Sequence, residues 1–350
     1  MLTTSFASLS ISVRKNVLTL FILAIFMAFT AFTASVYAAP KSGYKSFIVG
    51  NSQDAPASAN LSPGLVLMGG GLDVDEAFQW MCQRAGGGDF VVIRTSGTDA
   101  YNPYIQGLCP QMDSVETIII NNVTGANAPY VSSQIQNAEA LWIAGGDQST
   151  YTALWRGTAV QTGVNYLLNM KLAPVGGTSA GLAVLSQFIY TGARGSVTSS
   201  QALADPFHRY VTLEQDLFQS SLGADKLYDS HFVTRDRMGR SLVFLARIID
   251  NGWSMQPRGI GIDEHTAVLV LPNGSSSMVG TGAAYFLQSP GPAQVISSGV
   301  PLTYLNIGVY KVPQGGTFNF STWTGTGGVP YMLNVNNGSV TSTQAGGNIY

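Results

Sequence analysis

The chain has 350 residues, of which 45% are apolar and only 10% charged, and its formal net charge is −2. It is long enough for one large domain or two small ones, and its charged content lies well below the roughly 25% of typical soluble domains. With 17 basic and 19 acidic residues, it offers no basic stripe for a nucleic-acid backbone. Three histidines and two cysteines exclude a zinc cage of those residues. We expect no cofactor and no metal, although a carboxylate metal site stays open.

The first 38 residues have the pattern of a signal peptide. Arg14 and Lys15 form a short basic region, an apolar run follows over 17–32, and the small-residue site Val36-Tyr37-Ala38 comes next. We expect cleavage after Ala38, which makes the protein exported, to a periplasm or outside the cell. The apolar run is also long enough for an uncleaved membrane anchor, which is the alternative.

Export places the two cysteines, Cys82 and Cys109, in an oxidising compartment. Only one pairing is available to them. A disulfide and two buried free thiols explain the sequence equally well.

Strands and helices alternate after a polar linker expected over 39–62. In chain order we expect a strand at 64–68, a helix at 73–84, strands at 90–94, 115–120 and 140–144, a helix closing at 167–171, a strand at 172–175 and a helix at 180–189. Unbroken apolar strands separated by helices favour an α/β fold with a mostly parallel sheet flanked by helices. Glycine-rich turns follow three of these strands, at the sheet edge where ligands gather. We place the catalytic α/β domain at 63–291.

From residue 292 to Tyr350 the chain is dominated by Gly, Ser, Thr and Asn between short apolar runs. This pattern predicts a β-rich C-terminal appendage without a long helix. None of its residues carries an obvious chemical role.

The segment Gly177-Thr178-Ser179-Ala180-Gly181 lies between a predicted strand and a predicted helix. Small neighbours allow the sharp turn of a nucleophile elbow, which exposes the serine oxygen. The amides of Ala180 and of Gly146, from a neighbouring strand end, could then form an oxyanion hole. A phosphate-binding loop is the alternative, but no Gly-Lys-Ser/Thr follows a suitable glycine.

A serine nucleophile needs a base, and His231 is the best candidate among the three histidines. His208 is expected at the surface and His265 in a structural role. Three arginines follow His231 within nine residues and would disfavour its cationic form, which keeps the imidazole usable as a base. They are Arg235, Arg237 and Arg240. A merely solvated charged face is the alternative, although this chain is poor in charge.

Four ordered motifs resemble the cyanophycinase-like serine peptidases, relatives of aspartyl dipeptidase (peptidase E) with a class I glutamine amidotransferase-like fold. The motifs are Gly145-Gly-Asp-Gln148, Gly176-Gly-Thr-Ser-Ala-Gly181, Asp229-Ser-His-Phe232 with the three arginines, and Gly259-Ile-Gly-Ile-Asp-Glu264. Together they cover roughly residues 65–282. Because the elbow carries serine where amidotransferases use cysteine, the peptidase is the better match.

The resemblance implies a Ser–His–acid triad acting next to aspartyl residues, with Ser179 as nucleophile and His231 as base. The family acid is expected between these two, where the nearest placement is Gln201, with Asp205 as its rival. Substrate binding is implied for Gln148, Asp229, Ser230, Arg235, Arg237 and Arg240. Ser230 stands where the family usually has Gln, which leaves cyanophycin itself in doubt as the substrate.

The sequence therefore predicts an exported serine-type peptidase that acts on an aspartyl-containing peptide or polyamide. No nucleic acid and, after signal cleavage, no membrane is expected as a partner, and a homodimer stays open. The alternative is an exported binding protein or inactive member of the same fold, which Gln201 in the acid position would favour.

Overall fold

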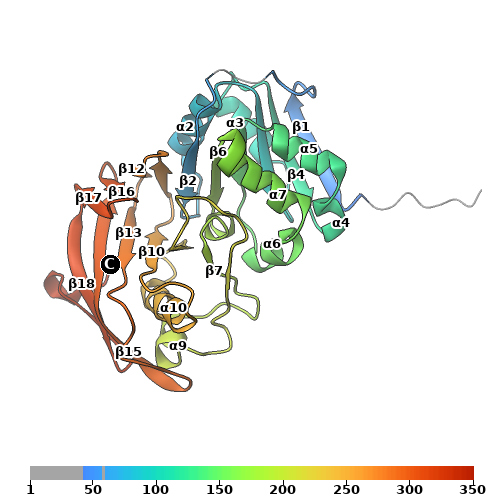
Figure 1. Ribbon diagram of the computed structural model, residues 1–350. Coiled ribbons are helices and arrows are strands. Elements are labelled where there is room, and N and C mark those ends of the chain that lie inside the picture. Colours follow the sequence, from blue (N-terminus) through green and yellow to red (C-terminus); the bar gives the residue numbers. More distant parts are fainter. Residues whose placement is uncertain (1–41, 57–59) are drawn as a thin grey trace, which may run out of the picture. The chain divides into compact units, whose positions relative to one another are not determined.

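Five apolar strands form the parallel centre of the larger sheet, in the order β4-β3-β5-β6-β2 (Figure 1). The structure, a computed structural model, describes residues 42–56 and 60–350, so the expected signal peptide lies outside the described residues. The five strands are β2 (Gly64–Met68), β3 (Asp89–Arg94), β4 (Ser114–Ile120), β5 (Ala140–Ile143) and β6 (Pro174–Thr178). Every residue of β2, β4, β5 and β6 is buried.

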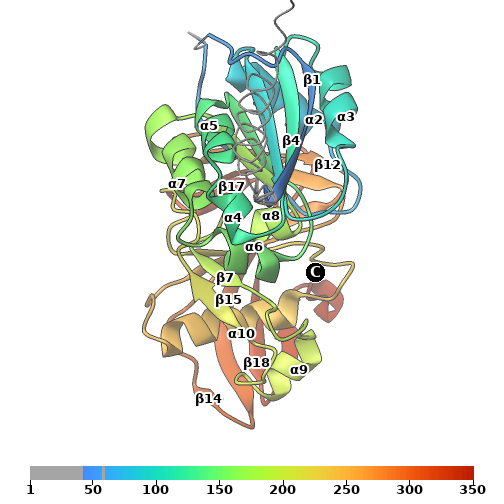
Figure 2. The same ribbon diagram turned by 90° about the vertical axis from the view of Figure 1, so that its right-hand side faces the viewer.

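Helices cover both faces of this sheet, as Figure 2 shows from the side. Successive strand side chains point to opposite faces. Val92 and Trp142 therefore pack with α2 and α3, whereas Val91 and Leu141 pack with α5 and α7. The helices are α2 (Asp75–Ala85), α3 (Tyr101–Leu108), α4 (Val123–Ala126), α5 (Pro129–Asn137), α6 (Gln148–Trp155) and α7 (Ala159–Tyr166), which a π-helical turn (Leu167–Lys171) extends. The predicted α/β fold with a mostly parallel, helix-flanked sheet is confirmed.

Two segments differ from the expected elements. Residues 44–50, expected within the linker, form β1 (Tyr44–Gly50), which pairs antiparallel with β4 over its whole length. Residues 180–189, expected as one helix, form only the short α8 (Ala180–Ala183) and then β7 (Phe188–Tyr190). The aromatic and β-branched residues of β7 suit a strand, and Phe188 pairs with Leu227 of the second sheet.

The second sheet has the strand order β19-β18-β15-β13-β10-β9-β7-β8, and β14 pairs with β15. Strands β9 and β10 are parallel neighbours, and α9 (Ser199–Ala204) and α10 (Met238–Asp250) lie close to this sheet (Figure 1). The strands are β8 (Leu213–Gln215), β9 (Lys226–Asp229), β10 (Arg258–Ile262), β13 (Ala283–Gln288), β14 (Val295–Ser297), β15 (Val300–Pro313), β18 (Val329–Asn336) and β19 (Ser339–Ser342).

The C-terminal region is β-rich, as predicted, and its strands continue both sheets. Strands β15, β18 and β19 extend the second sheet. The larger sheet continues past β2 through β11 (Thr266–Val270) and β12 (Ser275–Gly280), and the C-terminal region adds β16 (Thr317–Asn319) and β17 (Thr324–Thr326) to it. A 3-10 turn at Ala345–Gly347 follows β19. Residues 42–350 therefore form one unit, and the boundary at residue 292 stays a prediction.

Cys82 and Cys109 form a disulfide that joins α2 to the end of α3. Both cysteines are fully buried. Of the two alternatives for this pair, the structure has the bridge. Among the helices in the described ranges, none is long and apolar enough to cross a membrane.

Candidate active site

Ser179 lies in the sharp turn between β6 and α8. Its backbone has φ +52° and ψ −112°, a conformation that a residue other than glycine rarely adopts and that costs about 1–3 kcal/mol. Two glycines make the turn possible. A Cβ on Gly177 would lie 2.5 Å from the carbonyl carbon of Gly181, and one on Gly181 would lie 1.9 Å from the Ile143 carbonyl oxygen. The segment has the nucleophile-elbow geometry expected from its sequence.

His231 follows β9 and faces Ser179. The Ser179 hydroxyl lies 2.7 Å from Nε2 of His231, and the His231 amide donates to the Gly69 carbonyl over 2.7 Å. His231 also has a positive φ of +46°. Gly70 leaves room for the imidazole, since a Cβ there would lie 2.4 Å from Cε1 of the ring. The structure thus brings together the two residues proposed as nucleophile and base.

Ser179, His231 and Glu264 form a hydrogen-bonded chain. Oε1 of Glu264, its third member, lies 2.5 Å from Nδ1 of His231. Glu264 stands two residues past the end of β10, the parallel neighbour of the strand that leads to His231. The parallel pairing therefore delivers both side chains to the same sheet edge.

The expected contact of Gln201 with His231 is not present. Oε1 of Gln201 accepts from the Thr198 backbone amide, and the Gln201 backbone amide donates to the Thr198 hydroxyl, which forms a capping box at the start of α9. The rival Asp205 accepts from the amides of Phe207 and Gly299. Both side chains serve local backbone amides, which is the usual use of such residues at helix ends and turns.

Electrostatics favour a neutral imidazole beside an ionised carboxylate. Burial lowers the pKa of His231 below its ordinary 6.5, Glu264 opposes this shift, and Arg235 and Arg237 add to it. The hydrogen bond to His231 lowers the pKa of Glu264. Nδ1–H of His231 then donates to the carboxylate, which leaves Nε2 as the acceptor for the serine hydroxyl.

The amides of Ala180 and Gly146, predicted to form the oxyanion hole, belong to two segments that lie near Ser179. Ala180 opens α8, where an N–H has no acceptor within its own helix. The turn with Gly145 and Gly146 approaches Ser179, since a Cβ on Gly145 would lie 3.6 Å from Cβ of Ser179. The Tyr151 hydroxyl holds this turn by hydrogen bonds of 2.9 and 3.1 Å to the carbonyls of Ala144 and Gly145. Nothing in these contacts conflicts with the predicted oxyanion hole.

Beside this turn lies a cavity of about 280 Å³. It is lined by Gly146, Asp147, Gln148, Tyr190, Thr191, Gly192, Gly195, Ser196, Arg235, Arg237 and Arg240. Four of the predicted substrate-binding residues, Gln148 and the three arginines, therefore share one cavity. The Arg235 guanidinium makes no hydrogen bond or ion pair with any residue in the described part of the chain. A free guanidinium in such a cavity suits a carboxylate.

Asp229 and Ser230 lie beneath the cavity and do not line it. The Asp229 carboxylate, 4% exposed, accepts from Nε and Nη2 of Arg240 at 2.8 and 2.6 Å and from Arg237 at 3.2 Å. The two arginines outweigh its burial, so the pKa of Asp229 is lowered. The Ser230 carbonyl and hydroxyl accept from Arg237. Asp229 and Ser230 thus hold Arg237 and Arg240 in place. The sequence predicted that both residues contact the substrate directly, and this geometry does not offer such a contact.

The other two histidines stand outside the hydrogen-bonded chain. Nδ1 of His265 accepts from the Leu72 amide, and Nδ1 of His208 accepts from the Tyr210 amide. Each imidazole accepts from a backbone amide, which fits the structural role expected for His265, whereas His208, expected at the surface, is half-buried.

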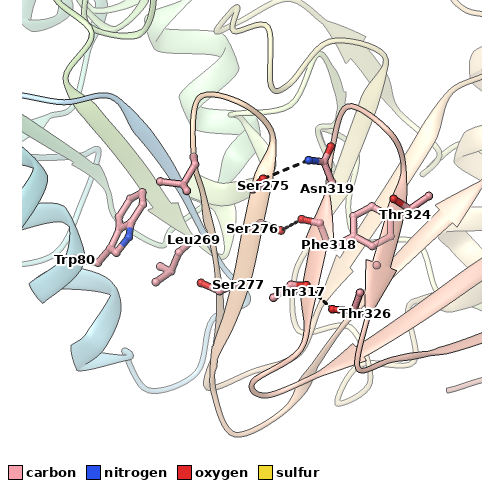
Figure 3. A pocket seen from close by; sticks show the side chains of 12 residues that line it. Trp80, Leu269, Ser275, Ser276, Ser277, Thr317, Phe318, Asn319, Thr324 and Thr326 are labelled. Atoms are coloured by element: carbon pink, nitrogen blue, oxygen red, sulfur yellow. Dashed lines mark hydrogen bonds between the residues drawn. The ribbon is translucent and has the colours of Figure 1, made fainter.

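A further cavity, of about 420 Å³, lies where Trp80 of α2 faces β12, β16 and β17 (Figure 3). Its lining is aromatic, aliphatic and rich in serine and threonine hydroxyls, and it includes no acid, histidine, lysine or arginine. Without a titratable side chain, it offers no general acid or base.

Glu264 is the functional residue that sequence reasoning missed. It ends the motif Gly259-Ile-Gly-Ile-Asp-Glu264, which carried the family resemblance but had received no role. The available signal was its place just beyond an apolar strand, the position that also marks Gly146 and Ser179. Gly70 carried the same signal, after the apolar strand 64–68.

Taken together, the elbow, the imidazole, the carboxylate and the amides form an arrangement that can activate a hydroxyl for attack on a carbonyl carbon.

No family model matches the chain. The chain is similar to a cyanophycinase of Synechococcus elongatus, with 22% identity over 69% of this chain and 73% of that protein. It is also similar to one of a Nostoc species, with 23% identity over 59% and 65%. Among solved structures, a peptidase from an acI-B1 actinobacterium matches 75% of this chain and 98% of its own, with 15% identity and a TM-score of 0.48.

The sequence similarity to these cyanophycinases confirms the resemblance that the four motifs indicated. The curated relatives support a cyanophycinase-like peptidase.

Proposed function

We propose that this protein is a serine-type peptidase that hydrolyses peptide or isopeptide bonds at aspartyl residues. The observation that carries the proposal is the hydrogen-bonded chain Ser179–His231–Glu264, with 2.7 Å between Oγ and Nε2 and 2.5 Å between Nδ1 and Oε1. Each member stands at the carboxyl end of a different strand of the α/β core.

In the proposed reaction Nε2 of His231 takes the hydroxyl proton while Oγ of Ser179 bonds to the carbonyl carbon. The amides of Gly146 and Ala180 donate to the oxyanion of the tetrahedral intermediate. His231 then passes its proton to the leaving nitrogen as the C–N bond breaks, leaving an ester on Ser179. Water, deprotonated by His231, attacks the ester carbon. The bond between this carbon and Oγ of Ser179 then breaks as His231 returns the proton to Oγ, which releases the acid and restores the enzyme. Glu264 holds the imidazole tautomer throughout.

The cavity with the three arginines supports the aspartyl preference. A carboxylate entering it would meet the unpaired Arg235 first, with Gln148 on the same lining. Asp229 neutralises part of the charge of the deeper pair, Arg237 and Arg240. Cyanophycinase relatives extend the proposal to a peptide or polyamide substrate.

The alternative of an inactive or purely binding member rested on a glutamine in the acid position. Glu264 now occupies that position, and Gln201 caps a helix. The observation that favoured the alternative is therefore gone.

The proposed location is outside the cytoplasm, from the signal-peptide pattern of residues 1–38. N-terminal sequencing of the exported protein is expected to begin at Ala39. A membrane-retained, full-length product would contradict cleavage.

The reaction itself is tested by incubating the purified protein with cyanophycin, a β-aspartyl-arginine dipeptide and an α-aspartyl dipeptide, with products identified by mass spectrometry. Labelling by a fluorophosphonate is measured in parallel on the wild type and on Ser179→Ala. We expect cleavage of at least one substrate and labelling only of the wild type. Turnover retained in a folded Ser179→Ala variant would end the proposal.

A further inference from the structure

Two cations lie side by side at the amino ends of β9 and β10. Lys226 is the first residue of β9 and Arg258 the first of β10, and the parallel pairing places them directly opposite each other. Like charges in register repel, and the repulsion grows where water is excluded. The chain has only 17 basic residues, so two of them side by side is an unusual arrangement. A negative charge nearby would relieve their repulsion.

No carboxylate in the described part of the chain supplies that charge at contact distance. Within residues 42–56 and 60–350, none of the ion pairs includes Lys226 or Arg258. The Lys226 ammonium, in a residue only 5% exposed, donates to a single acceptor, the Ala224 carbonyl, over 2.8 Å. Asp225 lies nearby and favours the charged form of both cations without pairing with either.

The buried ammonium has two further N–H donors, which find no acceptor among the residues that the structure describes. Burial, and after it the charge of Arg258, lower the pKa of Lys226 to about 8. The ammonium is therefore still mainly protonated at neutral pH. A bound anion would oppose this shift.

Both cations line one polar cavity of about 380 Å³. Asp225 and the three serines Ser221, Ser254 and Ser321 are among its other lining residues. The guanidinium carbon of Arg258 lies 4.6 Å from the Trp323 ring centre, a cation–π contact. Three serine hydroxyls and two cations around one small space suit the several oxygens of an oxyanion.

We propose that this cavity is a binding site for a small oxyanion, a phosphate or a carboxylate, held between Lys226 and Arg258. The site is separate from the arginine cavity beside Ser179. His231 and Glu264 follow the carboxyl ends of β9 and β10, whereas this pair stands at the amino ends of the same strands. An anion there fastens together the two strands that carry the base and the acid.

The test is a thermal-unfolding and calorimetric titration of the whole protein with sodium phosphate, sodium acetate and sodium succinate, each against sodium chloride at equal ionic strength. We expect saturable binding and a rise in Tm of about a few degrees for at least one oxyanion. The phosphate and carboxylate arms distinguish the two sources. An absence of binding by all three above the chloride baseline would overturn the proposal without any variant.

Three variants locate the binding. Lys226→Met removes the buried cation at similar volume, and we expect affinity to fall by about tenfold or more, the loss of one charge-assisted hydrogen bond. Lys45→Met removes an exposed lysine and Arg235→Ala alters the other cationic cavity. Both should keep the part of the response that Lys226→Met removes. A response lost in Arg235→Ala and kept in Lys226→Met would assign the anion to the substrate cavity and refute this site.

Should Lys226→Met not fold, Arg258→Gln serves the same purpose. It keeps a polar side chain at the partly buried strand end while removing the second cation. We expect the same loss of affinity. Unchanged phosphate and carboxylate affinity in this variant would equally refute the proposal.

Discussion

The Glu264→Gln variant tests which residue orients His231: Glu264, as the structure indicates, or Gln201, as the sequence predicted. Glu264→Gln keeps the size of the side chain but removes the negative charge 2.5 Å from Nδ1 of His231. An amide can donate to Nδ1 and so hold the imidazole in the wrong tautomer, with its proton on Nε2. In that tautomer the ring cannot accept the proton of Ser179.

The magnitude follows from the exposure of the carboxylate. For a buried acid in a serine triad, the same change lowers kcat about 10⁴-fold. The Glu264 side chain is 23% exposed, so water stabilises part of the charge and the loss should be smaller. We expect a fall of about 10²- to 10⁴-fold in kcat, equal to ~3–5 kcal/mol of transition-state stabilisation.

The assay is steady-state hydrolysis of the substrate identified above, measured across pH. The Glu264 carboxylate raises the pKa of His231, opposing burial. Its removal should therefore move the acid limb of kcat/KM to lower pH, in addition to lowering kcat. A purely structural defect would not shift this limb.

Gln201→Ala is the matched control. It removes the bond from the Thr198 amide to the Gln201 side chain at the start of α9 and keeps the bond from the Gln201 backbone amide to the Thr198 hydroxyl. About 0.5–1.5 kcal/mol of stability should be lost while kcat stays unchanged. Full activity in Glu264→Gln together with a large loss in Gln201→Ala would refute the assignment of the acid to Glu264.

Three further outcomes are expected. Ser179→Ala and His231→Ala should each lower kcat by several orders of magnitude, and the double variant little more, because the two act as one unit; additive losses would contradict this. Arg235→Ala should raise KM with Tm unchanged, since its guanidinium has no partner in the described part of the chain; an unchanged KM with a lower Tm would mark a structural role. Reducing the Cys82–Cys109 bridge, which spans 27 residues, should cost roughly 2–4 kcal/mol in denaturant unfolding while leaving kcat intact; two free thiols in the denatured, exported protein would show that no bridge forms.

Local patterns in the sequence were enough for the α/β class and for most of the active site. Unbroken apolar strands indicate a sheet that is buried on both faces, because their side chains pack against apolar residues above and below the sheet. The elbow at Ser179 is recognisable since the backbone conformation itself demands small neighbours. The arginines after His231 stand out because the rest of the chain has so few charges.

What the sequence left open depended on pairing between distant segments. Glu264 reaches His231, 33 residues earlier, only because β9 and β10 are parallel neighbours. Gln201, closer in sequence, is taken by the start of its own helix. Asp229 was likewise predicted to bind substrate, but it pairs with Arg240, which is buried in α10.

The edges of the two sheets were also decided by tertiary structure. Residues 44–50 look like a linker, yet they complete the hydrogen bonds of β4, whose edge would otherwise stay unpaired. The strands after residue 292 do the same for β12 and β13. The residues of a segment indicate that it can form a strand. Which strand it pairs with depends on the backbone edge that the rest of the fold leaves unpaired.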